Sequence, residues 1–164
     1  MSGNAAGRVS AEELEKAYAD AVADTLRRFE ATGSPVISDG EQRKSSFATY
    51  PLEGMEGLAA DGVVIPFKDG HTRQLPKLTR GPFRYAKHAG EYVRLAKPHA
   101  HRPLKQAVIS ASALSLLYPS DGIAGYSREE FIGDLIDEAA ADIRSALDAA
   151  RNACRSTLPR DGSH

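Results

Sequence analysis

The chain has 164 residues, which is enough for one domain with a substantial core. Hydrophobic residues make up 41% and charged residues 26%, as in ordinary soluble globular proteins. The net charge of -1 gives no reason to expect nucleic acid, a membrane surface or another polyanion as a partner. No apolar run reaches the ~20 residues that span a bilayer, and the N-terminus lacks a secretory pattern. The single cysteine, Cys154, excludes an internal disulfide and fits a reducing compartment, so we expect a cytoplasmic protein.

The first forty residues predict a helix followed by a buried strand. Residues 1–9 are small and polar, and we expect them to form a disordered lead-in. Ser10 and Glu13 have the spacing of a capping box at a helix start. Apolar residues then recur at helical spacing, namely Leu14, Tyr18, Val22, Leu26 and Phe29. Gly33 indicates the helix end, and residues 35–38 (PVIS) are typical of a short buried strand.

The middle of the chain is less regular. Residues 39–79 show no sustained period, with 63–65 as the one strand-like cluster, and a loop this long in a compact domain is usually functional. Residues 83–96 have a helical pattern. Residues 106–109 (QAVI) indicate a second buried strand, and residues 112–117 indicate a short helix.

The last predicted element is the clearest amphipathic helix in the chain. Ser127 and Glu130 form a second capping box before it. Its apolar positions are Phe131, Leu135, Ile136, Ala139, Ile143 and Leu147. The two predicted strands are separated by far more than a dozen residues, which favours a parallel α/β arrangement. Residues 151–164 (RNACRSTLPRDGSH) have no apolar period, and nothing there supports Cys154 as a nucleophile.

Polar residues follow the first predicted strand directly, in the sequence DGEQRKSS of residues 39–46. Ligands bind at the carboxyl ends of strands in α/β sheets and barrels. A carboxylate at this place can hold a substrate ammonium, and the basic residues after it can hold a carboxylate. A solvated turn is the alternative, and on pattern alone the better one, because Asp-Gly is a common turn dipeptide.

Two further groups of polar residues carry less information. Ser110, Ser112 and Ser115 follow the second predicted strand, where Ser112 can serve equally well as a helix cap. Histidines invite a metal hypothesis, namely His71, His88, His99 and His101. Zinc, however, takes four ligands with some on rigid elements, and the Pro-rich connector holding the last two has no cysteine or carboxylate nearby. We therefore expect no metal site in these residues.

Two stretches resemble the cobalamin-independent methionine synthase family. One is residues 36–50 (VISDGEQRKSSFATY), and the other is residues 105–144, which begin KQAVISASALS and end EEFIGDLIDEAAADIR. The resemblance covers about residues 11–149. It implies a (β/α)8 barrel that transfers a methyl group from methylated folate to the thiol of homocysteine, a small thiol amino acid. Zinc activates the thiol in this family, because coordination by Zn²⁺ deprotonates a group that is a poor nucleophile at neutral pH.

The resemblance also implies a set of substrate-binding residues. Glu41 takes the place of the family's acidic residue that binds the amino acid, and Asp39 and Gly40 match the same turn. Ser110 lies where the family's next strand reaches the pocket, although relatives usually have proline at the place of Ala111. The family's zinc ligands (a histidine, two cysteines and a glutamate) lie in later strands, and its opening strand comes before the first helix. Neither has a counterpart here, so we expect no catalytic residue and no metal ligand in this chain.

A barrel needs about 250 residues, so the resemblance predicts a partial TIM-type (β/α)8 barrel with parallel strands and a long insertion after the first strand. We divide the chain into the lead-in 1–9, the partial barrel domain 10–150 and an aberrant tail 151–164. By resemblance the chain comes from an S-methyltransferase, but we expect it to be inactive alone.

The tail has a possible genetic origin. In relatives this helix is followed by a strand similar to VQIDFTEGRLA, and a DNA segment encoding that strand, read one base later, encodes CRSTLPRDGSH, which is residues 154–164. We therefore expect a shift of reading frame near residues 149–153. If the neighbouring frame of the gene did not encode that strand, this idea would fail.

Two other functions stay open. One is a zinc-dependent transferase of the same superfamily that acts on another thiol, since a fold does not fix chemistry. The other is a non-catalytic α/β binding or interaction protein. An incomplete barrel exposes strand edges and apolar helix faces, which favours self-association.

Overall fold

The computed structural model describes residues 9–155, and the side chains up to residue 151. The predictions for residues 1–8 and 156–164 lie outside this range. The principal helices are α1 (Ala11–Ala31), α2 (Ala89–Ala96), α3 (Ala111–Leu114) and α4 (Arg128–Arg155). Short 3-10 turns are η1 (Tyr50–Leu52), η2 (Lys97–His99) and η3 (Ser115–Leu117). No helix within the described part has the length and apolar character that a membrane crossing requires.

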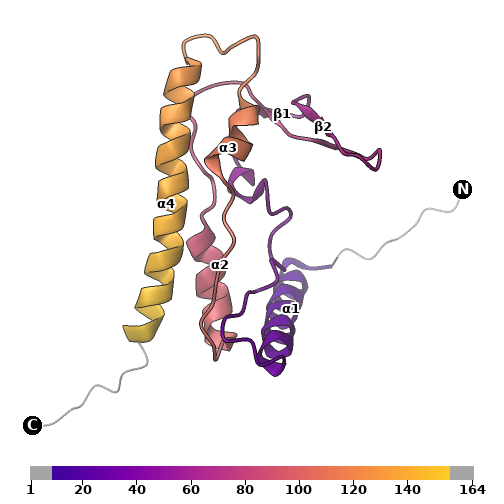
Figure 1. Cartoon of the computed structure of the whole chain (residues 1–164), viewed down its shortest axis with the longest axis vertical. Helices are drawn as coiled ribbons and strands as arrows, with labels where there is room; N and C mark the ends of the chain where they lie inside the picture. Colours follow the sequence, from indigo (N-terminus) through magenta and orange to yellow (C-terminus); the bar gives the residue numbers. More distant parts are fainter. Residues whose placement is uncertain (1–8, 156–164) are drawn as a thin grey trace, which may run out of the picture.

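The long helices lie side by side, with α2 between α4 and α1 (Figure 1). The contact between α2 and α4 is the most extensive between any two elements. Helix α3 lies above α2 in the same view, where it also contacts α4. The site described below lies near α1 and α2, on the connections between these helices.

Helix α1 begins and ends as the sequence predicts. The N–H of Glu13 donates to Ser10 Oγ (3.1 Å) and the N–H of Ser10 donates to Glu13 Oε2 (2.8 Å), which completes the capping box. Gly33 follows the helix with a φ of +77°, a conformation that glycine adopts without steric cost. The predicted apolar stripe is buried at Val22 and Leu26, whereas Leu14, Tyr18 and Phe29 are exposed.

The first predicted strand makes a single parallel bridge, and its partner, Leu104, lies just before the second predicted strand. Ile37 bridges Leu104: the N–H of Ile37 donates to Pro103 O (3.0 Å) and the N–H of Lys105 donates to Ile37 O (2.8 Å). Residues 106–109 do not form a strand, which corrects the prediction. The ladder ends because the chain turns immediately after Ser38. The described residues thus show a mixed α/β chain with small sheets, and a partial barrel is not seen in them.

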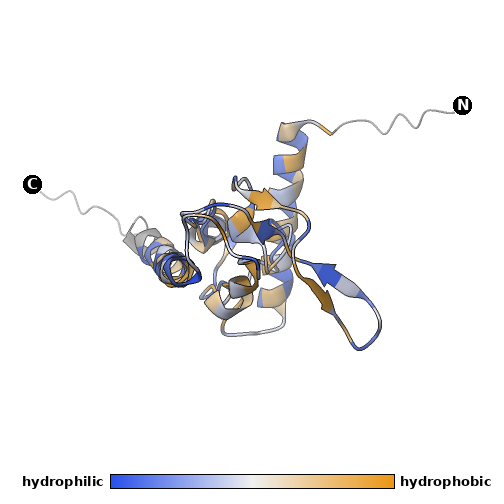
Figure 2. Ribbon diagram, turned by 90° about the horizontal axis from the view of Figure 1, so that it is seen from above, coloured by the Kyte–Doolittle hydropathy of each residue, from blue (hydrophilic) through white to orange (hydrophobic). Residues whose placement is uncertain are grey.

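The predicted insertion folds as two small antiparallel sheets. Strand β1 (Leu58–Ala59) pairs with β4 (Lys77–Leu78), and β2 (Val64–Pro66) pairs with β3 (Thr72–Gln74). The predicted strand cluster 63–65 therefore overlaps β2. The β2–β3 hairpin projects away from the helices, and its β2 side is hydrophobic while its β3 side is hydrophilic (Figure 2).

The helix predicted for residues 83–96 is wrong over its first six residues, because α2 begins at Ala89. Carboxylates one helical turn apart on α4 accept from the backbone of this segment instead, and we call Asp134, Glu138 and Asp142 the α4 carboxylate row. Phe83 N–H donates to Asp134 (3.1 Å), Tyr85 N–H to Glu138 (3.1 Å) and Ala89 N–H to Asp142 (2.5 Å). An extended segment whose amides bind another helix cannot also form helical hydrogen bonds.

The second half of the chain begins its helices close to the predicted places. Helix α3 begins one residue earlier than predicted, and its cap is Ser110 rather than Ser112, since Ala113 N–H donates to Ser110 Oγ (3.3 Å). The capping box before α4 is confirmed: Glu130 N–H donates to Ser127 Oγ (3.1 Å), and Ser127 N–H donates to Glu130 Oε2 (2.7 Å).

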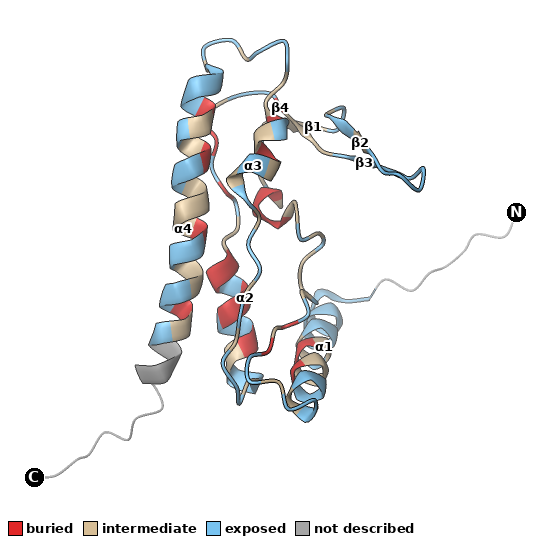
Figure 3. Cartoon of the chain, viewed as in Figure 1, coloured by how far each residue is buried: buried red, intermediate tan, exposed pale blue. Residues whose placement is uncertain are grey.

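The main core lies between α4, α3 and the segment before α2, as the buried residues in Figure 3 show. From α4 it takes Phe131 and Leu135. Three other residues of the predicted apolar stripe of α4 are exposed in the described structure: Ile136, Ile143 and Leu147 are 57%, 48% and 55% exposed. One side of α4 is therefore apolar and open.

Candidate functional site

The predicted polar turn lines a hollow of about 390 Å³ between residues 38–41 and residues 105–107. The parallel bridge of Ile37 with Leu104 brings these two segments together, because each hollow-lining segment follows its bridge residue directly. Asp39, Gly40 and Glu41 therefore lie together at the end of the first predicted strand, as expected from the sequence.

The backbone of the turn is left-handed at two consecutive residues. Gly40 has a φ of +66°, and a Cβ at this position would lie 2.7 Å from Thr25 Cγ2 of α1, so both conformation and space require glycine. Glu41 has a φ of +57°, which is uncommon for a residue with a side chain and costs about 1–2 kcal/mol. Its N–H donates to Asp39 Oδ1 (3.0 Å) and holds this conformation. Such local strain is found most often at functional sites.

Asp39 is a buried carboxylate, with 2% of its surface exposed. Loss of water raises the pKa of Asp39, and the N–H of Glu41 and the positive charge of Lys44 oppose this shift only in part. The negative charge of Asp39 is therefore incompletely compensated within the described structure. A cation placed in the hollow would compensate it.

Lys44 connects the two sides of the hollow through hydrogen bonds to one residue of each. Its side chain is 1% exposed, and its Nζ donates to Glu41 Oε1 (3.0 Å) and to Ala107 O (2.8 Å). The same Nζ lies 4.2 Å from the ring centroid of Tyr50 and 5.4 Å from that of Tyr92, as in a cation–π cage. Lys44 thus fixes one oxygen of Glu41. Among the described residues no hydrogen bond reaches the other oxygen, Oε2, and the Glu41 side chain is 35% exposed.

The lysine cage is anchored on α4. The Tyr50 hydroxyl donates to Asp142 Oδ2, and the other oxygen of Asp142 accepts from Ala89 N–H. Burial and the hydrogen bond to Asp142 raise the pKa of Tyr50 far above its usual range, so this hydroxyl keeps its proton. The position of Lys44, and through it that of Glu41, therefore depends on contacts with both α2 and α4.

Gln106 lines this hollow, whereas the sequence pattern predicts it as part of a strand. Its Nε2 and Oε1 are both buried and find no hydrogen-bond partner in the described part of the chain. The sequence contains one signal, a polar residue at the head of an apolar run. In the structure Gln106 lies two positions after the bridge residue Leu104, as Asp39 does after Ile37.

Ser110 occupies a different place from the other predicted residues. It is exposed, it caps α3, and its Oγ lies 3.1 Å from that of Ser112. It is not among the residues that line the hollow. A role for Ser110 in substrate binding stays a prediction.

The described residues do not fit a zinc site. They contain no group of three or more His, Cys, Asp and Glu side chains placed to hold a metal ion. The histidines make separate contacts: His71 with Asp69, His88 with Glu138 (3.3 Å) and His101 with Glu30 (3.2 Å). We therefore assign no chemical step through zinc to these residues.

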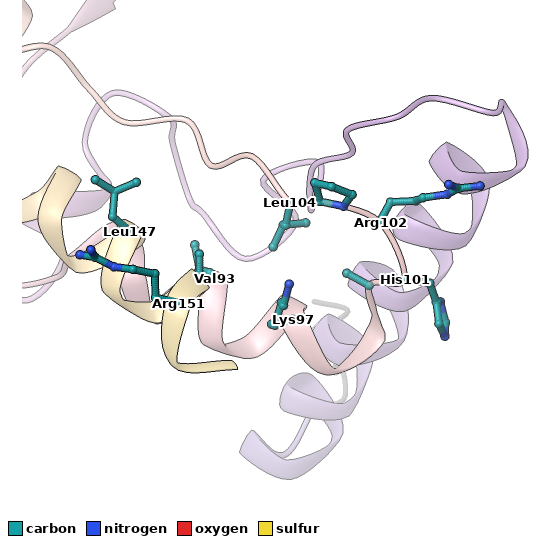
Figure 4. A pocket seen from close by; sticks show the side chains of 10 residues that line it. Val93, Lys97, His101, Arg102, Leu104, Leu147 and Arg151 are labelled. Atoms are coloured by element: carbon teal, nitrogen blue, oxygen red, sulfur yellow. The ribbon is translucent and has the colours of Figure 1, made fainter. Parts of the chain in front are cut away.

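A second hollow, of about 610 Å³, lies between η2 and the end of α4. Val93, Leu104 and Leu147 give it apolar walls, and Lys97 and Arg151 are among the basic residues around it (Figure 4). It contains none of the predicted substrate-binding residues and no carboxylate. The two hollows therefore differ in chemistry.

Two comparisons with known proteins agree on one family, although no family model matches the chain. The chain is 34% identical over 80 residues to a methionine synthase from Sulfolobus acidocaldarius, a match that covers 49% of this chain and 23% of that protein. Its fold is similar to that of a B12-independent methionine synthase from Shewanella sp. W3-18-1, solved in complex with selenomethionine. For that pair the TM-score is 0.67 and the identity 21%, covering 86% of this chain and 41% of the other.

The structural likeness shows that the fold is that of part of a B12-independent methionine synthase. With the sequence match, it confirms the predicted resemblance: the chain is similar to a part of the cobalamin-independent methionine synthases. The chain spans less than half the length of either protein.

Proposed function

We propose that the hollow beside Glu41 is part of the amino-acid site of a methionine synthase-type methyltransferase, which moves a methyl group from methylated folate to the thiol of homocysteine. The observation that carries this proposal is the backbone conformation of Glu41 together with the hydrogen bonding of its carboxylate. Its backbone is strained and one carboxylate oxygen is fixed by Lys44 (3.0 Å), while the other oxygen has no partner among the described residues. The amino acid in the Shewanella enzyme complex, selenomethionine, is consistent with such a ligand.

The chemistry assigned to this chain is recognition of an ammonium group. An ammonium in the hollow would donate to Glu41 Oε2 and approach the buried Asp39, and hydrogen bonds between charged groups are the strong ones in proteins. Zinc and methylated folate, as in the family, complete the proposed reaction. Because the described residues do not form a zinc site, thiol activation and methyl transfer are not assigned to them. We propose the cytoplasm as the location, since thiols stay reduced there.

Titration calorimetry of the purified chain with L-homocysteine under reducing conditions tests this function. Glu41→Gln keeps the size of the side chain and an acceptor for Lys44 but removes the charge. We expect it to weaken binding about tenfold or more, the usual effect of losing a hydrogen bond to a charged group. Glu129→Gln, on the exposed first turn of α4, is the control and should bind as the wild type does. Equal affinities of all three proteins would contradict the proposal.

A different thiol substrate within the same superfamily is distinguished by competition. Homocysteine and cysteine carry an ammonium beside the carboxylate, whereas 2-mercaptoethanesulfonate carries a thiol and an anion without an ammonium. If the sulfonate displaces homocysteine at equal concentration, ammonium recognition by Glu41 fails and another thiol becomes the better proposal.

A second candidate function is self-association, favoured by the open apolar side of α4. Ile136, Ile143 and Leu147 are each about half exposed and lie seven and four residues apart, which places them on one side of the helix. The molar mass from light scattering during size-exclusion chromatography tests it. A dimer that Ile143→Glu converts to a monomer supports the candidate, and a wild-type monomer at high concentration rejects it.

A further inference from the structure

The two orphaned polar atoms of Gln106 require an explanation. Nε2 can donate two hydrogen bonds and Oε1 can accept two, yet neither atom has a partner among the described residues and both are shielded by the surrounding atoms. A buried polar group without a partner costs about 1–3 kcal/mol. Native proteins rarely keep such a group unless water, an ion or a ligand satisfies it.

The surroundings of Gln106 narrow the choice of ligand. Gln106 and Lys105 form one side of the hollow, and Asp39 and Glu41 form the other. One side therefore offers a cation and amide donors, while the other offers two carboxylates. Lys44 does not alter this division, since its Nζ already binds Glu41 and Ala107.

The volume of the hollow is suitable for a small ligand that carries one positive and one negative group. The hollow measures about 390 Å³, near the lower end of the roughly 300–1,000 Å³ found for small-molecule sites. A ligand that satisfies both sides needs a cationic donor and an anionic acceptor a few bonds apart. The ammonium and carboxylate of an α-amino acid have this arrangement.

We infer that Gln106 binds the carboxylate of an α-amino acid through Nε2, assisted by Lys105, while the ammonium of the same ligand faces Glu41. This inference rests on the proposed function and deepens it: the hollow then selects zwitterionic amino acids over thiols that lack either group.

Three ligands separate the contributions of the two groups. L-methionine carries both charges, 3-(methylthio)propylamine lacks the carboxylate, and 4-(methylthio)butanoate lacks the ammonium. Their affinities are measured by calorimetry for the full wild-type chain, for Gln106→Leu and for Gln106→Glu. Gln74→Leu is the matched control, because Gln74 lies exposed in β3, away from the hollow.

We expect Gln106→Leu to lower the affinity for L-methionine about tenfold, as for the loss of one hydrogen bond to a charged group. Its affinity for the amine should equal that of the wild type. Gln106→Glu should lower the affinity for L-methionine more than Gln106→Leu does, and it should bind the amine at least as well as the wild type does. Removing an unsatisfied amide should also keep or raise the unfolding midpoint of ligand-free Gln106→Leu, which shows that the variant folds.

The outcomes distinguish the two proposals. If the wild type binds L-methionine and Gln106→Leu binds it equally well, the role of Gln106 is wrong and water satisfies the amide, while the proposed function stands. If Gln106→Leu lowers the affinity for the amine as much as that for L-methionine, the substitution acts by changing the shape of the hollow, and the inference fails. If the wild type binds none of the three ligands, the proposed function fails together with the inference.

Discussion

The carboxylates of α4 and those of the turn at residues 39–41 have opposite surroundings. Each member of the α4 carboxylate row accepts a backbone N–H from the segment that leads into α2, and Asp142 also accepts from the Tyr50 hydroxyl. Asp39 and Glu41 each have one oxygen engaged by their own turn or by Lys44, and no hydrogen bond to their other oxygens is found in the described part.

This difference distinguishes carboxylates that stabilise the fold from carboxylates that are available to bind a ligand. Where both oxygens are satisfied within the protein, as at Asp142, removal of the carboxylate should affect stability first. Where one oxygen is left over beside a hollow, removal should affect ligands first.

Asp142→Ala should produce the largest loss of stability. The substitution leaves the Tyr50 hydroxyl and the Ala89 N–H without their buried partner, so we expect the unfolding free energy to fall by about 3 kcal/mol. Asp137→Ala, at an exposed position of the same helix, should change it by no more than about 0.5 kcal/mol. Urea unfolding followed by circular dichroism measures both, and equal losses would show that Asp142 is not a structural anchor.

Lys44→Met should lower the unfolding free energy by about 2 kcal/mol, because it leaves the Ala107 carbonyl and one oxygen of Glu41 without their donor. Lys77→Met removes a lysine from a more exposed ion pair with Asp61, and we expect less than about 1 kcal/mol there. The same unfolding assay applies. A smaller effect for Lys44 than for Lys77 would reject the view that the tyrosine cage organises the turn.

Two glycine substitutions should change the stability of the chain in opposite directions. Gly40→Ala should destabilise by about 1 kcal/mol or more, since its Cβ would meet Thr25 at 2.7 Å and its φ is +66°. Gly133→Ala should stabilise α4 by up to about 1 kcal/mol, because the added Cβ meets nothing within 4 Å in a helix. Thermal unfolding midpoints measure the pair, and the same sign for both would contradict the geometry of the turn.

Asp39→Asn should stabilise the ligand-free chain, and by an amount that depends on pH. Burial raises the pKa of Asp39 in the folded chain above its ordinary value of 3.8, so the folded state holds the proton more tightly than the unfolded state. The wild type therefore gains stability from this group as pH falls through the raised pKa, and the gain is complete below 3.8. The advantage of the variant should be largest at pH 7 and shrink towards pH 4. A difference that does not change with pH would show that Asp39 is not desolvated.

Local rules in the sequence are sufficient for the starts of α1 and α4 and for the turn at residues 39–41. The boxes at Ser10 and Ser127 need only residues three positions apart, and the Asp-Gly dipeptide after an apolar run predicts the turn of Asp39, Gly40 and Glu41. Long-range contacts explain what could not be predicted. The segment before α2 is extended because its amides reach α4 carboxylates 51 to 53 residues away.

Two other features depended on packing that a sequence pattern does not contain. The apolar spacing of α4 predicts one buried stripe, but coverage of Ile136 or Ile143 depends on whether another segment lies against them. The orphaned amide of Gln106 follows from the tertiary structure, in which residues 38–41 lie opposite it across the hollow. Periodicity identifies which residues can be buried, and the tertiary contacts decide which of them are.

The most direct test of the account is an amide chemical-shift map of the isotope-labelled chain during titration with L-methionine. We predict saturable shifts centred on Gly40, Glu41 and Gln106, with little change along α4. Shifts confined to the second hollow around Val93 and Leu147, or no saturable shift at all, would contradict an amino-acid site between residues 38–41 and 105–107.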